Sequence, residues 1–254
     1  MRRRGNMSEY GDQINVTLDD DVLTIEIDKM DASSHIGLPM ALRDAHQSEA
    51  KFVVITGKDR KFLSPESYDH EWIKTINSYG YVEQILRESE DTLRHSISLD
   101  KPTIAKVWAP GAHQLGASIA LACDFIIAAD DATFSDPHLS GFGLPPGDGG
   151  FVLWPNRVGM TRAKEFLMLD RVATAQEAVE IGLINKAVPA DELDAEVDKL
   201  LAKLRSFDYS SLRLTKHVLN NYAKQDMLTV GHPGIAWETM RFVGKISEGK
   251  SGGE

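Results

Sequence analysis

A short segment of this 254-residue sequence, FSDPHLSGFGLPPGDGG at 134–150, holds a histidine and an aspartate among prolines and glycines. Because proline and glycine turn a chain back on itself, the segment is predicted to be neither a regular helix nor a regular strand. Its two arms would bring His138 and Asp148 within hydrogen-bond reach. An imidazole paired with a carboxylate has a fixed tautomer and is a stronger base, so this pair could take a proton from water near neutral pH.

Asp148 also has a structural alternative, because it precedes a helix expected to open at Gly149, and aspartate is a favoured N-cap residue. Capping does not explain His138, so we prefer the chemical interpretation. Asp136, in the same loop, is interpreted as a turn former rather than as a base.

The composition argues against several other kinds of site. A formal net charge of -10 does not suit non-specific nucleic-acid binding, which needs clustered lysine and arginine. Cys123 is the only cysteine, and the eight histidines lack the helical spacing of a zinc site, so we expect no disulfide, no metal and no cofactor. One local basic cluster, at Lys58, Arg60 and Lys61, could meet phosphates or be a solvated loop.

The N-terminal sequence and the hydropathy of the chain predict where the protein is found in the cell. The start, MRRRGNMSEY, has three arginines without an apolar run behind them, so it resembles neither a secretory nor a twin-arginine signal. No stretch approaches the roughly 18 to 20 apolar residues of a membrane helix. We therefore expect a cytoplasmic protein that binds no membrane.

Apolar patterning predicts the elements that must hold these side chains. Alternating or continuous apolar runs predict strands, the first two as a hairpin, at 14–18, 22–27, 52–56, 103–107, 124–129 and 183–188. Helical spacing predicts helices at 38–46, 71–98 (one long or broken), 115–123, 150–158, beyond 159, 175–182, and from 191 onward with breaks near 207 and at 231–234. These elements favour one domain, with a flexible tail (1–13), a core (14–190) and a C-terminal helical extension (191–254).

From about Ile14 to Pro189, the chain resembles the crotonase superfamily, also called the enoyl-CoA hydratase/isomerase family. The motifs that carry the resemblance follow the family's order and spacing: VLTIEI, FVVITG, KPTIAKV, LACDFIIAADDATF and RVGMTRAKEFLMLDRVATAQEAVEIGLINKAVP. The resemblance implies an α/β fold, a crotonase-like ββα spiral with a C-terminal helical trimerisation region. It also implies a homotrimer or a hexamer.

The resemblance further implies an oxyanion hole, in which two backbone N–H groups hold the oxygen of an enolate made from a carbonyl substrate. The first donor loop matches FLSPES, where the amide belongs to Ser64 and Pro65 replaces the usual glycine. The second matches PGAHQLGAS (110–118), with the amide of Leu115 or Gly116 as donor. His113 in this loop is a further candidate, with an exposed loop histidine as its alternative.

The two glutamates with which hydratases of this family bind water are absent. Their positions fall on Ala117 or Ser118 and on His138, so ordinary hydratase chemistry is not expected. Asp148 instead stands where several branches carry a catalytic aspartate, dienoyl-CoA isomerases among them. FSDPHL, PGDG and WP resemble the β-diketone hydrolase branch that includes 6-oxocamphor hydrolase, and AWE (236–238) resembles its C-terminal acid at Glu238, which could otherwise be a solvated helix residue.

These features predict a hydrolase that cleaves a carbon-carbon bond of a 1,3-dicarbonyl compound. Asp148 and His138 would activate water, and His113, oriented by Glu238, would protonate the enolate carbon. Tyr68, Trp237 and His35 are expected to line the pocket.

Two alternatives stay open. One is an acyl-CoA isomerase or hydratase-type enzyme, in which Asp148 shuttles a proton on a coenzyme A thioester. The other is a non-catalytic binding protein on a degenerate crotonase fold, which Pro65 and the missing run of glycines at 110–118 favour.

Overall fold

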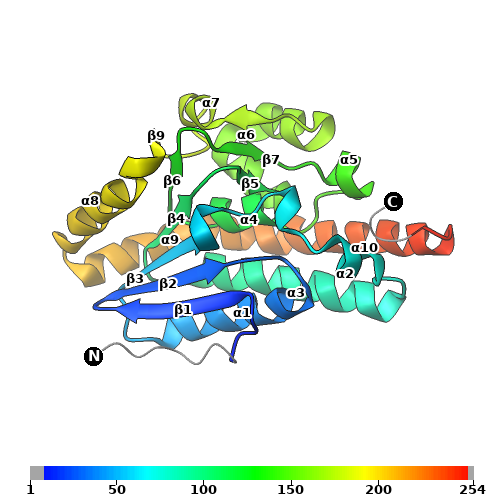
Figure 1. The fold of residues 1–254 in the computed structure, drawn as a ribbon, viewed down its shortest axis with the longest axis horizontal. Helices are drawn as coiled ribbons and strands as arrows, with labels where there is room; N and C mark the ends of the chain where they lie inside the picture. Colours follow the sequence, from blue (N-terminus) through cyan, green and yellow to red (C-terminus); the bar gives the residue numbers. More distant parts are fainter. Residues whose placement is uncertain (1–8, 251–254) are drawn as a thin grey trace.

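The computed structural model describes residues 9–250, and its centre is a six-stranded sheet (Figure 1). The strands run in the order β1-β2-β3-β4-β6-β9. Only the first pair is antiparallel, with a register from Ile14 opposite Ile27 to Asp19 opposite Val22. The predicted strands are confirmed, and their bounds are β1 (Ile14–Asp19), β2 (Val22–Ile27), β3 (Phe52–Gly57), β4 (Thr103–Val107), β6 (Phe125–Ala129) and β9 (Lys186–Val188).

A second, three-stranded sheet has the order β5-β7-β8. Its strands are β5 (Gly111–His113), β7 (Thr133–Ser135) and β8 (Ala173–Thr174). Two or three residues are too few for an alternating pattern, so the sequence did not indicate these strands. Together the two sheets and their crossover helices form the expected α/β spiral.

Helix α1 (Ala32–Gln47) begins earlier than the predicted 38–46 because Asp31 caps it. The Asp31 carboxylate accepts hydrogen bonds from the amides of Ser33 (2.8 Å) and Ser34 (2.9 Å), two of the four donors that a helix start leaves unpaired. The predicted helix at 71–98 is broken into α2 (His70–Lys74) and α3 (Tyr79–Ser98). In the predicted tail, residues 1–8 lie outside the described residues, whereas the Tyr10 hydroxyl donates to Asp44 on α1 (3.1 Å).

The segment 134–150 is more regular than predicted. It begins in β7 and contains the short helix α5 (His138–Phe142), which ends at Gly143 in the left-handed conformation (φ 61°). Helices α4 (Leu115–Leu121) and α6 (Gly150–Leu169) flank this segment, and α6 changes direction at Gly159.

The last third of the chain is mostly helical: α7 (Ala175–Glu180), α8 (Leu193–Arg205), α9 (Tyr209–Asp226) and α10 (His232–Ser247), with a short 3₁₀ turn at Ala190–Glu192. Two further 3₁₀ turns, Lys58–Arg60 and Pro65–Ser67, follow β3. The predicted break at 231–234 is wrong, because the π-helical turn Met227–Gly231 joins α9 to α10. Pro233 fits there because the first turn of a helix needs no amide donor.

The helices cover both faces of the main sheet. One core cluster gathers β1–β4 with α1, α3, α4 and α6, and a second lies between the other face and α8. Helix α10 runs past α3 to the end of the molecule opposite α8 (Figure 1). Within residues 9–250, no helix combines the length and apolarity needed to cross a bilayer.

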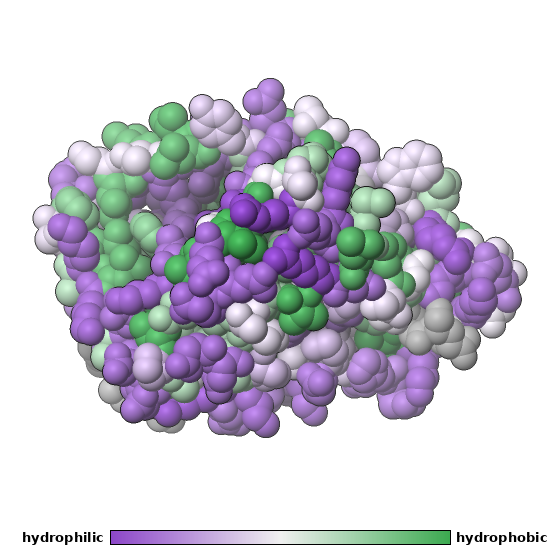
Figure 2. All heavy atoms as spheres, turned by 90° about the horizontal axis from the view of Figure 1, so that it is seen from above, coloured by the Kyte–Doolittle hydropathy of each residue, from purple (hydrophilic) through white to green (hydrophobic). Residues whose placement is uncertain are grey.

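The surface carries both polar and apolar side chains. Figure 2 shows apolar patches among polar side chains on the face seen from above. Large exposed apolar side chains also follow α9, where Leu214, Val218 and Tyr222 stand one turn apart.

Candidate active site

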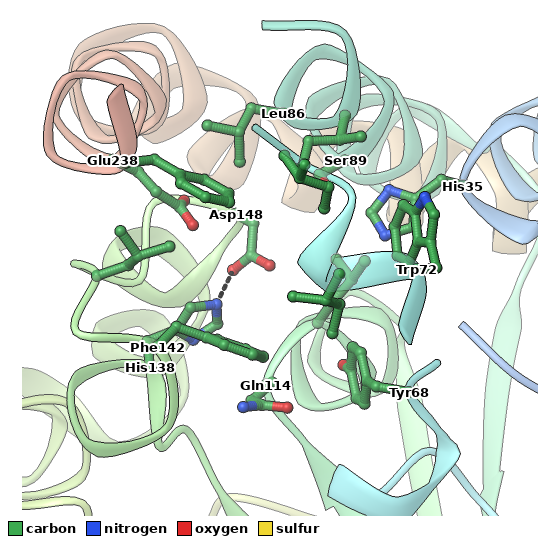
Figure 3. A pocket seen from close by; sticks show the side chains of 16 residues that line it. His35, Tyr68, Trp72, Leu86, Ser89, Gln114, His138, Phe142, Asp148 and Glu238 are labelled. Carbon is green, nitrogen blue, oxygen red and sulfur yellow. Dashed lines mark ion pairs between the residues drawn. The ribbon is translucent and has the colours of Figure 1, made fainter. Parts of the chain in front are cut away.

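A cavity of about 70 Å³ lies where α1, α3, α4, α10 and the 138–148 segment meet (Figure 3). Most of its wall is apolar: Trp72, Ile73, Ile76, Ile85, Leu86, Leu115, Phe142, Leu144 and Phe242. The polar groups are few and come from separate elements, which is the usual composition of a small-molecule site.

His138 and Asp148 are brought together as predicted. His138 is the first residue of α5, and its Nε2 lies 3.3 Å from Oδ1 of Asp148. The two side chains form an ion pair in the wall of the cavity (Figure 3). Helix α6 has Gly149 as its N-cap and no capping side chain, so the alternative of Asp148 as a cap is wrong. Oδ1 of Asp148 accepts no hydrogen bond from any described residue.

The carboxylate that orients His138 is Asp136, not Asp148 as we expected. Asp136 is fully buried, and its Oδ1 is hydrogen-bonded to Nδ1 of His138. The interpretation of Asp136 as a turn former is therefore incomplete. A signal was available in the sequence: an acid two residues before a histidine, with a proline between them, is placed to reach the ring.

This arrangement sets the charge of His138. Burial lowers the pKa of His138, but attraction to Asp148 and Asp136 outweighs burial and holds the pKa well above the ordinary value of 6.5. His138 is therefore an imidazolium near neutral pH, held between two carboxylates.

Glu238 faces the same cavity from α10 and is only 3% exposed, so its interpretation as a solvated helix residue is wrong. Burial, followed by repulsion from Asp148, raises the pKa of Glu238 well above 4.5 and so favours the protonated carboxyl. Trp237 is 61% exposed and does not line the cavity, contrary to prediction. Neighbouring residues of a helix lie about 100° apart, so the two side chains face different ways.

His113 does not meet Glu238, which corrects the expected pairing. Its Nδ1 lies 2.6 Å from Oγ of Ser135, and its Nε2 lies 3.2 Å from Oγ1 of Thr133. The ring is buried in the second sheet rather than exposed in a loop, and burial lowers its pKa. It is not among the cavity's lining residues.

The two expected oxyanion loops are neighbours. The amide of His113 donates to the carbonyl of Leu63 (3.0 Å), and a side chain at Gly116 would come within 2.5 Å of Leu63 Cβ. Two of the three candidate donors have protein partners: the Ser64 amide donates to Ser67 Oγ (3.3 Å), and the Gly116 amide donates to the Tyr68 hydroxyl (3.3 Å). The third candidate, Leu115, lines the cavity.

Tyr68 and His35 line the cavity as predicted. The His35 ring lies 4.9 Å from the Trp72 ring, and its Nδ1 has no hydrogen-bond partner among the described residues. Burial lowers the pKa of His35 to about 4, so this imidazole is neutral above that pH. Burial and the charge of Asp148 raise the pKa of Tyr68, which keeps its phenol protonated.

Sequence reasoning missed Gln114. Its backbone has φ 55° and ψ -132°, a region that favours glycine, directly before α4. Its carboxamide is buried at the cavity, and Oε1 has no partner within residues 9–250. The available signal was a non-glycine residue in a loop where the resemblance leads one to expect several glycines.

The basic cluster is partly neutralised. Lys58 pairs with Asp28 (2.7 Å), and Arg60 pairs with Asp194 (3.3 Å). A surface pocket of about 390 Å³ lies beside Lys58 and Lys61. In the described part of the chain, no group of three or more histidine, cysteine, aspartate or glutamate side chains could hold a metal ion.

Residues 30–242 match the model of the enoyl-CoA hydratase/isomerase family. The chain is similar to a crotonyl-CoA hydratase from Syntrophomonas wolfei (39% identity, over 51% of this chain and 49% of that protein). It is also similar to a short-chain-enoyl-CoA hydratase from Clostridium acetobutylicum (34% identity, over 78% of this chain and 72% of that protein). The matched part thus spans about half the length of the first relative.

Solved structures show the same fold. A beta-diketone hydrolase from the cyanobacterium Anabaena, bound to (S)-3-oxocyclohexyl acetic acid, has a TM-score of 0.85 at 23% identity and covers 94% of this chain and 96% of its own. An enoyl-CoA hydratase/isomerase from Mycobacterium paratuberculosis has a TM-score of 0.83, also at 23% identity, and covers 93% of this chain and 98% of its own.

Proposed function

Because this chain belongs to the enoyl-CoA hydratase/isomerase family, the crotonase superfamily, we propose that it is an enzyme that hydrolyses a carbon-carbon bond of a β-diketone. The observation that carries the proposal is the buried group of Asp136, His138, Asp148 and Glu238 beside a largely apolar cavity. The fold that it shares with a beta-diketone hydrolase is consistent with this chemistry.

Water addition to an enoyl thioester is less well supported. The two positions for hydratase glutamates hold the buried Ala117 or Ser118 and His138, none of which is a carboxylate. The acids that are present, Asp148 and Glu238, come from different elements and carry different protonation states, as an acid-base pair requires.

In the first step, Asp148 takes a proton from water, and the resulting hydroxide bonds to one carbonyl carbon. The imidazolium of His138, 3.3 Å from Asp148, orients that carboxylate towards the cavity. The raised pKa of His138 makes Asp148 rather than His138 the base, which revises our expectation from the sequence.

In the second step, the bond to the central carbon breaks, the first carbonyl re-forms as a carboxylic acid, and the electron pair passes to an enolate. Protonated Glu238 gives its proton to the enolate carbon, the role that the sequence suggested for His113. Return of the proton from Asp148 to Glu238 restores the site. The net reaction consumes one water and yields one carboxylic acid and one ketone.

Incubation with a panel of cyclic and linear 1,3-diketones tests the proposal. In water enriched in heavy oxygen, the carboxylate product should gain one heavy atom. In deuterated water, a diketone whose central carbon carries no exchangeable hydrogen should gain one deuterium at that carbon. Asp148→Asn should lower kcat about 100- to 10,000-fold while the fold is retained, as is typical when a general base is removed. Full turnover by Asp148→Asn would contradict its role.

An acyl-CoA isomerase or hydratase is the second candidate, and the names of the curated relatives favour it. For such an enzyme, the phosphates of the coenzyme A substrate would be expected at the pocket beside Lys58 and Lys61. Calorimetric titration with crotonyl-CoA and with a diketone distinguishes the two candidates, since a diketone hydrolase does not need the coenzyme moiety. A protein that binds either compound and transforms neither would be the non-catalytic alternative.

The absence of a cofactor, the cytoplasmic location and the homotrimeric or hexameric assembly stay predictions. They are consistent with membership of a family whose members are typically oligomeric and act on small molecules.

A further inference from the structure

We infer that the Tyr68 hydroxyl, rather than the backbone amide of Gly116, binds the carbonyl oxygen on which negative charge develops. This inference rests on the proposed function. Its starting observation is that the Gly116 amide already donates to the Tyr68 oxygen (3.3 Å). The Ser64 amide likewise donates to Ser67 Oγ (3.3 Å), so these two backbone amides are already engaged within the protein.

Tyr68 is placed to bind the substrate oxygen in place of these two amides. Tyr68 is 8% exposed and lines the cavity, and its isolated β-bridge with Met30 anchors the backbone. In Figure 3 it lies with Gln114 on the lower side of the cavity, while Asp148 and Glu238 lie above. A substrate between these groups would have its reacting carbon towards the acids and an oxygen towards the phenol.

The phenol has the chemistry of a hydrogen-bond donor. A hydroxyl that accepts a bond from an N–H group becomes a stronger donor, because successive hydrogen bonds polarise one another. Its present acceptor is the His113 carbonyl at 3.3 Å, a long contact. An enolate oxygen is a stronger, charged acceptor and would take the hydrogen bond from this carbonyl without a proton transfer.

The group that the phenol would bind is a ketone oxygen, because the side chains next to it carry no positive charge that would attract a carboxylate. On the Tyr68 side of the cavity the polar neighbours are the carboxamide of Gln114 and the neutral imidazole of His35. With the carboxylate of Asp148 also facing this cavity, Tyr68 would bind an uncharged ketone rather than a carboxylate and would donate to its enolate oxygen.

A non-cleavable ligand tests this without turnover. Cyclohexanone, isotope-labelled at its carbonyl carbon, is bound to the wild type and to Tyr68→Phe, and the carbonyl resonance and stretching frequency are measured. In the wild type, we expect the resonance to move downfield and the stretch to fall; in Tyr68→Phe both shifts should be largely lost. On a cleaved diketone, kcat should fall about 100- to 1,000-fold with a smaller change in KM.

Tyr10→Phe is the matched control, because it removes a phenol that donates to Asp44 and does not line the cavity. Fluorinated tyrosine at position 68 is a second, nearly isosteric variant that makes the phenol more acidic and should enlarge the carbonyl shift. An unchanged shift in Tyr68→Phe would overturn this inference alone. No bound ketone in the wild type, together with no cleaved diketone, would overturn the proposed function as well.

Discussion

At the scale of single residues, Asp136 is the group that orients His138. It is fully buried, it is bonded to Nδ1 of His138, and it leaves Nε2 facing Asp148. Attraction to Asp148 and Asp136 together holds the pKa of His138 well above 6.5. The site therefore presents a fixed positive charge between two negative ones.

Asp136→Asn tests this assignment. Removing one carboxylate should lower the pKa of His138 towards its ordinary value of 6.5, because one of the attractions that outweigh burial is lost. Above that pH, Asp148 would lose its charged partner, so kcat on a diketone should fall as pH rises, unlike in the wild type. Kinetics from pH 5 to pH 9 would measure this, with the exposed Asp131→Asn as control. A profile identical to that of the wild type would show that Asp136 only fills space.

Gln114 combines backbone strain with an unpaired buried carboxamide oxygen. Gln114→Gly should relieve about 1–3 kcal/mol of strain, offset by about 0.5–1 kcal/mol for the freer unfolded chain. We therefore expect a higher Tm together with a higher KM for the substrate. Thermal unfolding and steady-state kinetics measure the two effects. In contrast, Gln84→Gly on the exposed face of α3 should lower Tm.

At the scale of elements, the approach of α10 to the 138–148 segment places Glu238 in the cavity. A side chain at Gly147 would come within 2.5 Å of the Gly234 carbonyl oxygen and 2.8 Å of Oε2 of Glu238. Glycine at these positions allows the helix backbone and the loop backbone to touch. The π-helical turn before α10 carries the chain into this position.

Gly147→Ala should push α10 away and cost about 1–3 kcal/mol of stability, because neither backbone can yield easily. It should also lower kcat, since Glu238 moves with the helix. Chemical denaturation and kinetics check both effects. Gly80→Ala, where the added methyl group meets no atom within 4 Å, is the matched control and should leave activity unchanged. Wild-type stability in Gly147→Ala would refute the close approach.

At the scale of the whole molecule, Glu238 links stability to pH. Its folded pKa lies above 4.5, so the folded protein keeps a proton that the unfolded chain loses as pH rises past 4.5. The free energy of unfolding therefore falls as pH rises from that value to the folded pKa. His138 acts in the same direction at higher pH: its stabilising effect is complete below 6.5 and is lost through its raised folded pKa.

Glu238→Gln should remove the first of these effects. The amide is neutral in both states, so the variant should match the wild type near pH 4 and become increasingly more stable than it towards pH 8. Denaturant titrations across this range provide the measurement, with the exposed Glu71→Gln as control. The same variant should lose activity because it has no proton to give. A stability difference that does not change with pH would contradict a raised pKa.

The exposed apolar stripe on α9 is a candidate surface for contact between subunits. Leu214, Val218 and Tyr222 are each more than 60% exposed and lie on one face of the helix. We expect the protein to have three or six times the 28.1 kDa mass of one chain. Val218→Asp should reduce the mass measured by light scattering, because a buried charge is costly at an apolar interface. A wild-type protein that runs as a single chain would refute the predicted assembly.

The sequence by itself determined the six strands of the main sheet, most helices and the family, because hydrophobic period and short motifs are local properties. It also determined that His138 and Asp148 could meet, since one proline- and glycine-rich loop carries both. Only the tertiary structure decided that Asp136 holds the ring of His138, that Glu238 faces the cavity while Trp237 faces outward, and that His113 lies in the second sheet. Protonation, too, depends on burial and on charges from distant segments, and those are set when α10 and the loop pack together.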